Sequence, residues 1–311
     1  MAALIDVILP VFLVIGFGYL AAWKKYFSES AVEGLMRFAQ NFAVPSLLFS
    51  AISKIDLAAD FDIPLLASFY IGAFTGFALG FLGARYLFER NTADSIAIGF
   101  CALFSNTVLL GLPIMERAYG AEALNGNFAI VSVHALVVYA FGVTLMEITR
   151  SNGAVSKIDL SRKILTSFAK NPLLIAIFLG FAVNLGNIAI PDAVNAAVNM
   201  MVLAALPAAL FALGGTLTRY RPEGDMKAIA WVTVVSLIVH PAVTYSLGTW
   251  IFDLNQAQLR SAVVTAAMAP GVNSYLFANM YGAARRVAAS TVLIATACSI
   301  FTIWVWLIIL P

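Results

Sequence analysis

Charged side chains are scarce in this sequence. They make up 11% of its 311 residues, whereas a soluble domain carries roughly 25%. Hydrophobic residues account for 62%, and the mean hydropathy is +0.93, so a water-soluble fold is excluded. The net charge is only +2, which leaves no basic surface of the kind that nucleic-acid binding requires. The lipid bilayer is therefore a predicted partner, and nucleic acid is not.

Cysteine and histidine are also scarce, with two of each. Cys101 and Cys298 lie within apolar runs, where cysteine behaves as a small buried hydrophobe. His134 and His240 alone do not supply a multi-histidine metal site, so no metal and no cofactor are expected. Paired aspartates, an H-E-x-x-H zinc motif and a serine–histidine pair, one of which an intramembrane protease needs, are not visible at useful spacing. The sequence therefore argues against an enzyme.

Long apolar runs fill most of the chain and are separated where charge, glycine, proline and asparagine collect. A bilayer core about 30 Å thick requires roughly 20 apolar residues per helix. We predict ten such spans, at residues 4–23, 31–53, 63–88, 94–118, 127–148, 171–189, 192–218, 227–252, 257–281 and 287–310. The first lacks a basic leader and a small-residue cleavage site, so it is predicted to span rather than to be a signal peptide. The expected fold class is an all-α membrane protein with ten transmembrane helices.

Basic residues are distributed unevenly over the connections between these spans. Fifteen of them fall at alternate connections: Lys24, Lys25, Arg37, Arg85, Arg90, Arg150, Lys157, Arg162, Lys163, Lys170, Arg219, Arg221, Lys227, Arg285 and Arg286. The opposite side has Lys54, Arg117 and Arg260. Because basic residues of short loops are retained in the cytoplasm, we expect an integral protein of the plasma (inner) membrane with both termini extracytoplasmic.

The two halves of the chain match at an offset of 162 residues. This shift aligns Pro10 with Pro172, Gly18 with Gly180, residues 44–49 with 206–211, and Tyr119-Gly120 with Tyr281-Gly282. Each copy holds five spans, an odd number, so the second must enter the membrane upside down, as in the inverted repeats of secondary transporters. The predicted organisation is a first repeat at 1–148, a cytoplasmic connecting segment at 149–170 and a second, inverted repeat at 171–311.

Spans four and nine contain the strongest functional signal. Span four reads Ser105-Asn106-Thr107-Val108-Leu109-Leu110-Gly111-Leu112-Pro113, and span nine reads Ala269-Pro270-Gly271-Val272-Asn273-Ser274. Proline removes a backbone donor and glycine adds freedom, so both helices are predicted to be interrupted near mid-membrane. Freed backbone groups must be buried or line a wet cavity, and helix N-termini there attract an anionic carboxylate. The alternative is a pair of proline kinks with asparagines bonding between helices.

The predicted substrate-binding residues follow from these segments. They are Asn106, Thr107, Gly111, Pro113, Pro270, Gly271, Val272, Asn273 and, one turn before Pro45, Asn41. His240 is a weaker candidate for carrying a proton, and a structural role is favoured for it. No acidic pair is expected near mid-membrane.

At these residues the sequence resembles the auxin efflux carrier family, over nearly the whole chain. The resemblance rests on residues 41–45 with Leu48-Phe49, on 106–113 followed by Tyr119-Gly120, and on 270–273 before Tyr281-Gly282. It implies a fold similar to bile-acid symporters and sodium/proton antiporters, with helices four and nine crossing at a substrate site. It also implies a scaffold of spans 1, 2, 6 and 7, an elevator-like movement of spans 3–5 and 8–10, and a homodimer through the scaffold. Thr107 and Leu110 depart from the family's usual pattern in span four.

The predicted function is secondary transport of a small organic acid, a carboxylate, by alternating access. The alternative is a sodium- or proton-coupled symporter or antiporter of the same fold with a different substrate, and a receptor or structural role also remains open. The sequence does not specify which acid is carried, the direction of flux, the coupling ion or the oligomeric state.

Overall fold

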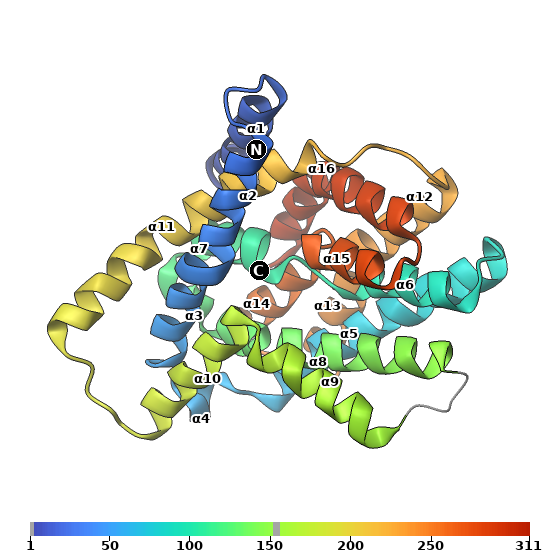
Figure 1. Ribbon diagram of the computed structural model, residues 1–311. Coiled ribbons are helices and arrows are strands. Elements are labelled where there is room, and N and C mark those ends of the chain that lie inside the picture. The colour runs from blue at the N-terminus through green and yellow to red at the C-terminus, as the bar shows by residue number, and fades with distance from the viewer. Residues whose placement is uncertain (1–2, 152–155) are drawn as a thin grey trace.

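The protein, seen in a computed structural model, is described over residues 3–151 and 156–311, and within these ranges every regular element is a helix (Figure 1). The α-helices are α1 Leu9–Trp23, α2 Glu29–Phe38, α3 Val44–Ile52, α4 Leu57–Asp60, α5 Ile63–Leu82, α6 Thr92–Leu103, α7 Leu112–Tyr119, α8 Asn125–Arg150, α9 Lys157–Ala169, α10 Pro172–Leu185, α11 Asp192–Leu217, α12 Met226–Val234, α13 His240–Trp250, α14 Gln256–Ala266, α15 Val272–Tyr281 and α16 Arg285–Ile309. The π-helical segments η1 Ala3–Ile8, η2 Ala39–Ala43, η3 Gly83–Leu87, η4 Thr107–Gly111 and η6 Val235–Val239, and the short 3₁₀ helix η5 Ala121–Leu124, extend or join them.

Six helical runs are long and apolar enough to cross a membrane within the described residues. They are Ile5–Trp23, Ile63–Leu87, Ala121–Arg150, Asp192–Leu217, Met226–Trp250 and Arg285–Ile309. The four other predicted spans are also helical but fall short of these criteria. Residues 29–52 form one helical run of α2, η2 and α3 that carries charge at its start, and α10 has only 14 residues. The spans predicted at 94–118 and 257–281 are each divided into shorter helices.

The helices pack in two groups, which Figure 1 shows on opposite sides of the molecule. The first, called here the α1–α11 group, consists of α1, α2, η2, α3, α10 and α11, with α1 packed along α11 and α3 along both α10 and α11. The second, called the crossing group, consists of α5 to α8 and α12 to α16, with α5 against α6 and α13, and α16 against α12 and α15. Contacts between the groups are sparser. They run through η1, which leads into α1, against α7 and α16, through α3 and α10 against α8, and through α11 against η4.

Glycines allow the α1–α11 group to pack with backbones in contact. A Cβ atom at Gly18 of α1 would lie 2.0 Å from the carbonyl oxygen of Phe211 in α11. A Cβ atom at Gly180 of α10 would lie 3.2 Å from the carbonyl oxygen of Phe49 in α3. Small residues are the usual means of close helix approach in membranes. Gly18 and Gly180 are 162 residues apart, and so are Phe49 and Phe211, so the contact between α1 and α11 has a counterpart between α10 and α3.

The repeated Tyr-Gly pairs mark two helix ends. Gly120 follows α7 with φ of 88°, and Gly282 follows α15 with φ of 62°. Glycine adopts positive φ without a steric penalty, which explains why both copies place it there. An arginine guanidinium lies over each preceding ring, at 4.3 Å for Arg260 over Tyr119 and 5.0 Å for Arg150 over Tyr281, within the range of a cation–π contact.

The segment predicted as a connection at 149–170 contains a helix. The α9 helix leaves Ile158 and Leu165 exposed, at 78% and 64%, and it is joined to α8 by an ion pair between Lys163 and Glu147. Residues 152–155 of this connection lie outside the described residues. A helix with apolar and basic residues together is typical of a position in the membrane interface.

Arginines from separate connections gather at one end of the helix bundle. A surface hollow of about 590 Å³ is lined by Arg90, Arg219, Arg221, Arg285 and Arg286 together with Glu223 and Asp225. Arg90 donates to Asp225 at 2.9 Å. Partial burial opposes ionisation of Asp225, but hydrogen bonds from Arg90 and from the amides of Ala228 and Lys227 hold the pKa of this carboxyl below its ordinary value.

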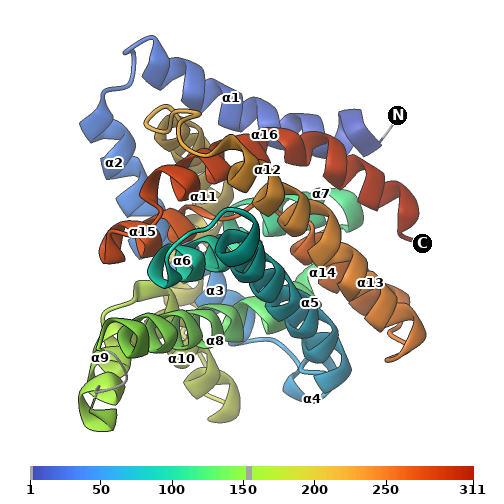
Figure 2. The ribbon, with the colours of Figure 1, turned by 90° about the vertical axis from the view of Figure 1, so that its right-hand side faces the viewer.

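Two other arginines contact the ends of the chain. Arg117 donates to the carbonyl oxygen of Asp6 in η1 at 2.6 Å, and Arg260 donates to that of Pro311 at 2.7 Å. Figure 2 shows the end of α16 and the start of the chain at the same edge of the bundle, with α9 at the opposite edge. Both termini therefore lie at one end of the molecule.

Candidate functional site

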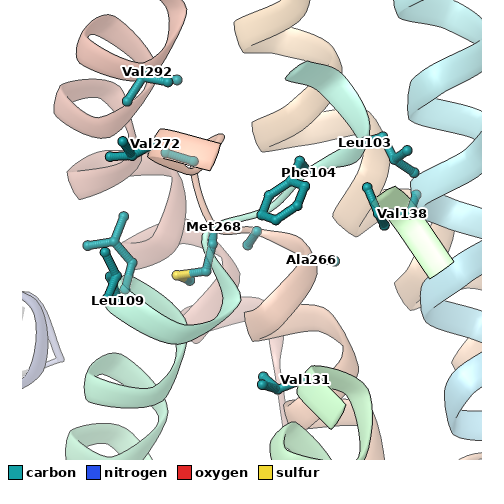
Figure 3. Packing of buried hydrophobic residues seen from close by; sticks show 14 of the residues in the cluster. Leu103, Phe104, Leu109, Val131, Val138, Ala266, Met268, Val272 and Val292 are labelled. Carbon is teal, nitrogen blue, oxygen red and sulfur yellow. The ribbon is translucent and has the colours of Figure 1, made fainter. Parts of the chain in front are cut away.

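Two extended segments meet at the centre of the crossing group. Ser105, between α6 and η4, forms an isolated antiparallel bridge with Pro270, between α14 and α15. The amide of Asn106 donates to the carbonyl oxygen of Ala269 at 2.8 Å, and the amide of Gly271 donates to that of Phe104 at 3.1 Å. Figure 3 shows Phe104, Met268 and Val272 gathered where the two segments pass. The two bonds pair backbone groups that each helix leaves free at its interruption.

Local sequence explains where each helix restarts. Pro113 is the second residue of α7 and follows the π-helical η4 directly, so it lacks an amide hydrogen inside the helical run that starts at Thr107. Pro270, at the bridge, leaves no buried amide unpaired. Asn106 caps η4, since its Oδ1 atom accepts from the amide of Leu109 at 3.2 Å. The same asparagine therefore shapes the chain and presents its amide group at the crossing.

Two helix beginnings converge on this crossing. The run of η4 and α7 starts at Thr107, and α15 starts at Val272. No side chain caps α15, and among the described residues the amides of Val272 and Asn273 have no hydrogen-bond acceptor. Helix N-termini carry about half a positive charge. Their free amides form a favourable environment for an anion.

A cavity of about 60 Å³ adjoins the crossing and lies between the two helix groups. The α1–α11 group contributes Gln40, Val44, Leu48, Leu173 and Ile177 to its wall. The crossing group contributes Phe104, Ser105, Asn106, Thr107, Val108, Leu109, Val131, His134, Ala135, Gly271, Val272 and Asn273. No charged residue is among these described lining residues, so polar contacts come from amide, hydroxyl, imidazole and backbone groups. This size and lining suit a small ligand held by neutral donors.

Comparison with known proteins decides the family. The model of a family described as "Membrane transport protein" matches residues 3–307, which is nearly the whole chain. The chain belongs to the membrane transport protein family. The resemblance to the auxin efflux carriers is thereby confirmed, and the protein is an integral membrane transporter rather than an enzyme.

Three relatives within the membrane transport protein family are distant but match over nearly their full lengths. An "Uncharacterized transporter YfdV" of Escherichia coli strain K12 is 24% identical over 303 residues, which cover 96% of this chain and 95% of that protein. A "Putative malonate transporter" of Rhizobium meliloti is 25% identical over 311 residues, covering 97% and 94%. A "Probable auxin efflux carrier component 5b" of rice is 22% identical over 352 residues, covering 97% and 95%.

In this member of the membrane transport protein family, five of the nine residues predicted from sequence line the central cavity. They are Asn106, Thr107, Gly271, Val272 and Asn273. Asn106 and Thr107 are buried, at 6% and 4% exposure, whereas Asn273 is half-buried and makes no hydrogen bond through its side chain among the described residues.

The other four predicted residues lie around the cavity but not in its wall. Pro270 is buried in the backbone bridge, and Gly111 is buried beside Asn106 and Met268. Pro113 lines a separate hollow of about 960 Å³ between α1, α3, α7 and α11. Asn41 is exposed and lines a neighbouring pocket of about 340 Å³, which Asn273 also lines.

Sequence reasoning missed three polar residues of the cavity wall. Gln40 precedes Asn41, and Ser105 precedes Asn106, so both belong to the segments that were singled out. His134 gave no local signal, because it sits within a long apolar helix without a motif around it. Its position at the cavity comes from the packing of α8 against α3 and α6, which sequence spacing does not reveal.

Proposed function

We propose that the protein is a secondary transporter that moves a small organic anion, a carboxylate, by alternating access. The observation that carries this proposal is an uncharged, mainly apolar cavity with a few polar groups, lying at two helix N-termini between two groups of helices. Malonate, which names one relative, is a small carboxylate.

A carboxylate at the crossing would accept hydrogen bonds from N–H groups that have no acceptor among the described residues. The free amides of Val272 and Asn273 and the side-chain amides of Asn106 and Asn273 provide neutral donors on both sides of the crossing. Hydrogen bonds to a charged group contribute about 1.5–3 kcal/mol each. Binding without a lysine or arginine also leaves the empty cavity neutral. The empty carrier therefore moves no charge through the membrane core.

Alternating access follows from the two helix groups. In this proposal the α1–α11 group is the scaffold, and the crossing group carries the substrate past it in an elevator-like movement. The cavity wall draws on both groups, so relative sliding opens it toward one side or the other. The pocket that contains Asn41 and Lys170 shares Gln40, Ala135, Leu173 and Asn273 with the cavity, whereas the hollow that contains Pro113 shares none. We therefore assign this conformation as open toward the side on which Lys170 lies, which is the predicted cytoplasmic side.

An inverted repeat of two five-helix units, 1–148 and 171–311, is part of the same proposal. Exchanged contacts support it: Gly18 meets Phe211, and Gly180 meets Phe49, with both partners shifted by 162 residues. Reciprocal contacts of this kind are the mark of two units related by a two-fold axis. The homodimer through the scaffold stays a prediction, which the mass of the detergent-solubilised protein would test.

Counterflow tests the transport function directly. Proteoliposomes loaded with unlabelled malonate should accumulate external labelled malonate transiently, because a carrier exchanges the two pools through one site. A panel of mono- and dicarboxylates added in competition should rank the substrates. Liposomes loaded with a neutral sugar alcohol serve as the control. Binding of acids without any counterflow would instead favour a receptor.

Both termini are predicted to lie outside the cytoplasm, because the arginine-rich hollow and the chain ends occupy separate ends of the bundle. In a variant lacking Cys101 and Cys298, an impermeant thiol reagent added to intact cells should label Ala189→Cys and leave Ser156→Cys unlabelled. Ser156 is the N-cap residue of α9, and Ala189 lies in the exposed loop after α10. The opposite labelling pattern would contradict the assignment.

The sodium-coupled alternative receives no support from the cavity. Sodium favours several oxygen ligands that include carboxylates, and no aspartate or glutamate is among the described lining residues. Uptake that depends on external sodium would revive that alternative.

A further inference from the structure

His134 is a buried histidine with both ring nitrogens unpaired. It lies in α8, is 2% exposed and lines the central cavity. Neither Nδ1 nor Nε2 has a hydrogen-bond partner among the described residues. A buried polar group normally finds a partner, because leaving it without one costs about 1–3 kcal/mol. Among the described residues of the cavity wall, His134 is the one with such unpaired side-chain atoms, whereas His240 has an unpaired Nε2 away from the wall.

Apolar and aromatic residues hold the imidazole in place from the neighbouring helices. The ring of Phe104 meets it edge-on with centroids 5.0 Å apart, Phe69 of α5 does so at 5.6 Å, and Tyr70 stacks at 6.1 Å. The elements packed around it thus fix its orientation while offering no acceptor for a ring proton.

Few titratable groups face this imidazole. Tyr70 of α5 stacks on it directly. Tyr139 of α8 contacts Phe104, and His240 of α13 contacts Phe69, the two phenylalanines that lie against the imidazole. Cys101 of α6 is buried nearby in the same core. The α3 and α10 residues of the cavity wall, Val44, Leu48, Leu173 and Ile177, are apolar. Among the described residues of the wall, His134 is the one side chain that becomes a cation by taking up a proton.

We propose that His134 takes up a proton when the carboxylate binds, so that anion and proton occupy the cavity together. This inference rests on the proposed function. The proton comes from water on the side to which the cavity is open and adds to one ring nitrogen, and the other nitrogen retains its hydrogen. The resulting imidazolium offsets one negative charge of the bound acid in the cavity. The anion and the proton leave on the opposite side of the membrane, which returns the imidazole to its neutral form. Transport is then a proton symport.

The physical reason is the cost of charge inside the membrane. A lone carboxylate in a cavity without cationic side chains pays a desolvation cost that neutral donors offset only in part. An imidazolium beside it forms a charge-assisted hydrogen bond, which is shorter and about twice as strong as a neutral one. The empty carrier stays uncharged, so a proton gradient couples only to the loaded form.

Calorimetry in two buffers measures the coupled proton. Malonate binding to the purified protein should be measured at pH 7.5 in phosphate and in Tris. The two binding enthalpies should differ by the difference between the buffers' ionisation enthalpies, which corresponds to about one proton taken up per malonate bound. His134→Gln should reduce this difference to near zero. Wild-type affinity should fall about tenfold per pH unit above neutrality, because the bound state holds one more proton than the free state. The affinity of His134→Gln should be nearly independent of pH.

His240→Gln is the matched comparison. His240 is also buried, but its Nδ1 atom lies 3.4 Å from the hydroxyl of Ser105 and the residue is not in the cavity wall. It should keep the proton uptake of the wild type. Proton uptake that disappears in His240→Gln and persists in His134→Gln overturns the inference. Malonate binding to the wild type without any proton uptake also overturns it. Absence of malonate binding in a folded wild type rejects the proposed substrate class itself, which is a distinguishable failure.

Discussion

Replacing Asn273 by alanine is expected to weaken carboxylate binding about 5- to 150-fold, corresponding to a loss of 1–3 kcal/mol of binding energy. Its side chain is half-buried at the cavity and bonds to no other described residue, so the loss falls on the ligand rather than on the fold. Asn106→Ala should show a similar loss of affinity. It should also reduce stability by about 1 kcal/mol, because Asn106 caps η4.

The measurement is equilibrium binding of malonate to purified variants, with thermal unfolding in detergent recorded alongside. Asn279→Ala provides the control, since Asn279 lies on the same helix α15, is exposed and lines the arginine-rich hollow instead. It should bind with wild-type affinity. Unchanged affinity in both cavity variants would mean that the crossing serves packing alone and that the substrate binds elsewhere.

Adding one methyl group at Gly18 should disrupt the α1–α11 group. The new Cβ atom in Gly18→Ala would lie 2.0 Å from the carbonyl oxygen of Phe211, and neither backbone can yield without separating α1 from α11. Overpacking of this kind costs about 1–3 kcal/mol, occasionally more. We expect a lower unfolding temperature and a reduced yield of monodisperse protein in detergent.

Gly16→Ala is a closely matched control. Gly16 lies two residues earlier on the same helix, is exposed, and has no atom within 4 Å of its built Cβ position. Alanine there should be neutral or stabilising by up to about 1 kcal/mol, because it favours the helix. If both variants unfold at the same temperature, the close approach of α1 and α11 is not essential to the fold.

The helical membrane fold was predictable because its signals are local. Hydropathy marks the spans, and the Pro-Gly pair at 270–271 and the Ser-Asn-Thr segment at 105–107 mark where α14 and α6 have already ended. The α9 helix was not predicted. Its apolar and charged residues alternate around the helix and cancel in an average taken along the chain.

The cavity itself was only partly predictable, because its wall joins helices that are distant in sequence. Gly111 and Pro113 were predicted site residues because glycine and proline favour an interruption that frees backbone groups. The helical turn that starts at Thr107 carries Pro113 away to another hollow. Gln40 and His134 reach the cavity only through the packing of α3 and α8, and no motif encodes that packing.

The backbone bridge also bears on how the site tells one end of a substrate from the other. It joins residues 165 apart, Ser105 and Pro270, whereas the tyrosines that end α7 and α15 are 162 apart. The chain thus has three more residues between Ser105 and Tyr119 than between Pro270 and Tyr281, and the longer stretch contains the π-helical η4. The two flanks of the crossing are therefore not equivalent by a two-fold rotation. An asymmetric acid would bind in a single orientation, with its carboxylate assigned to one flank and its tail to the other.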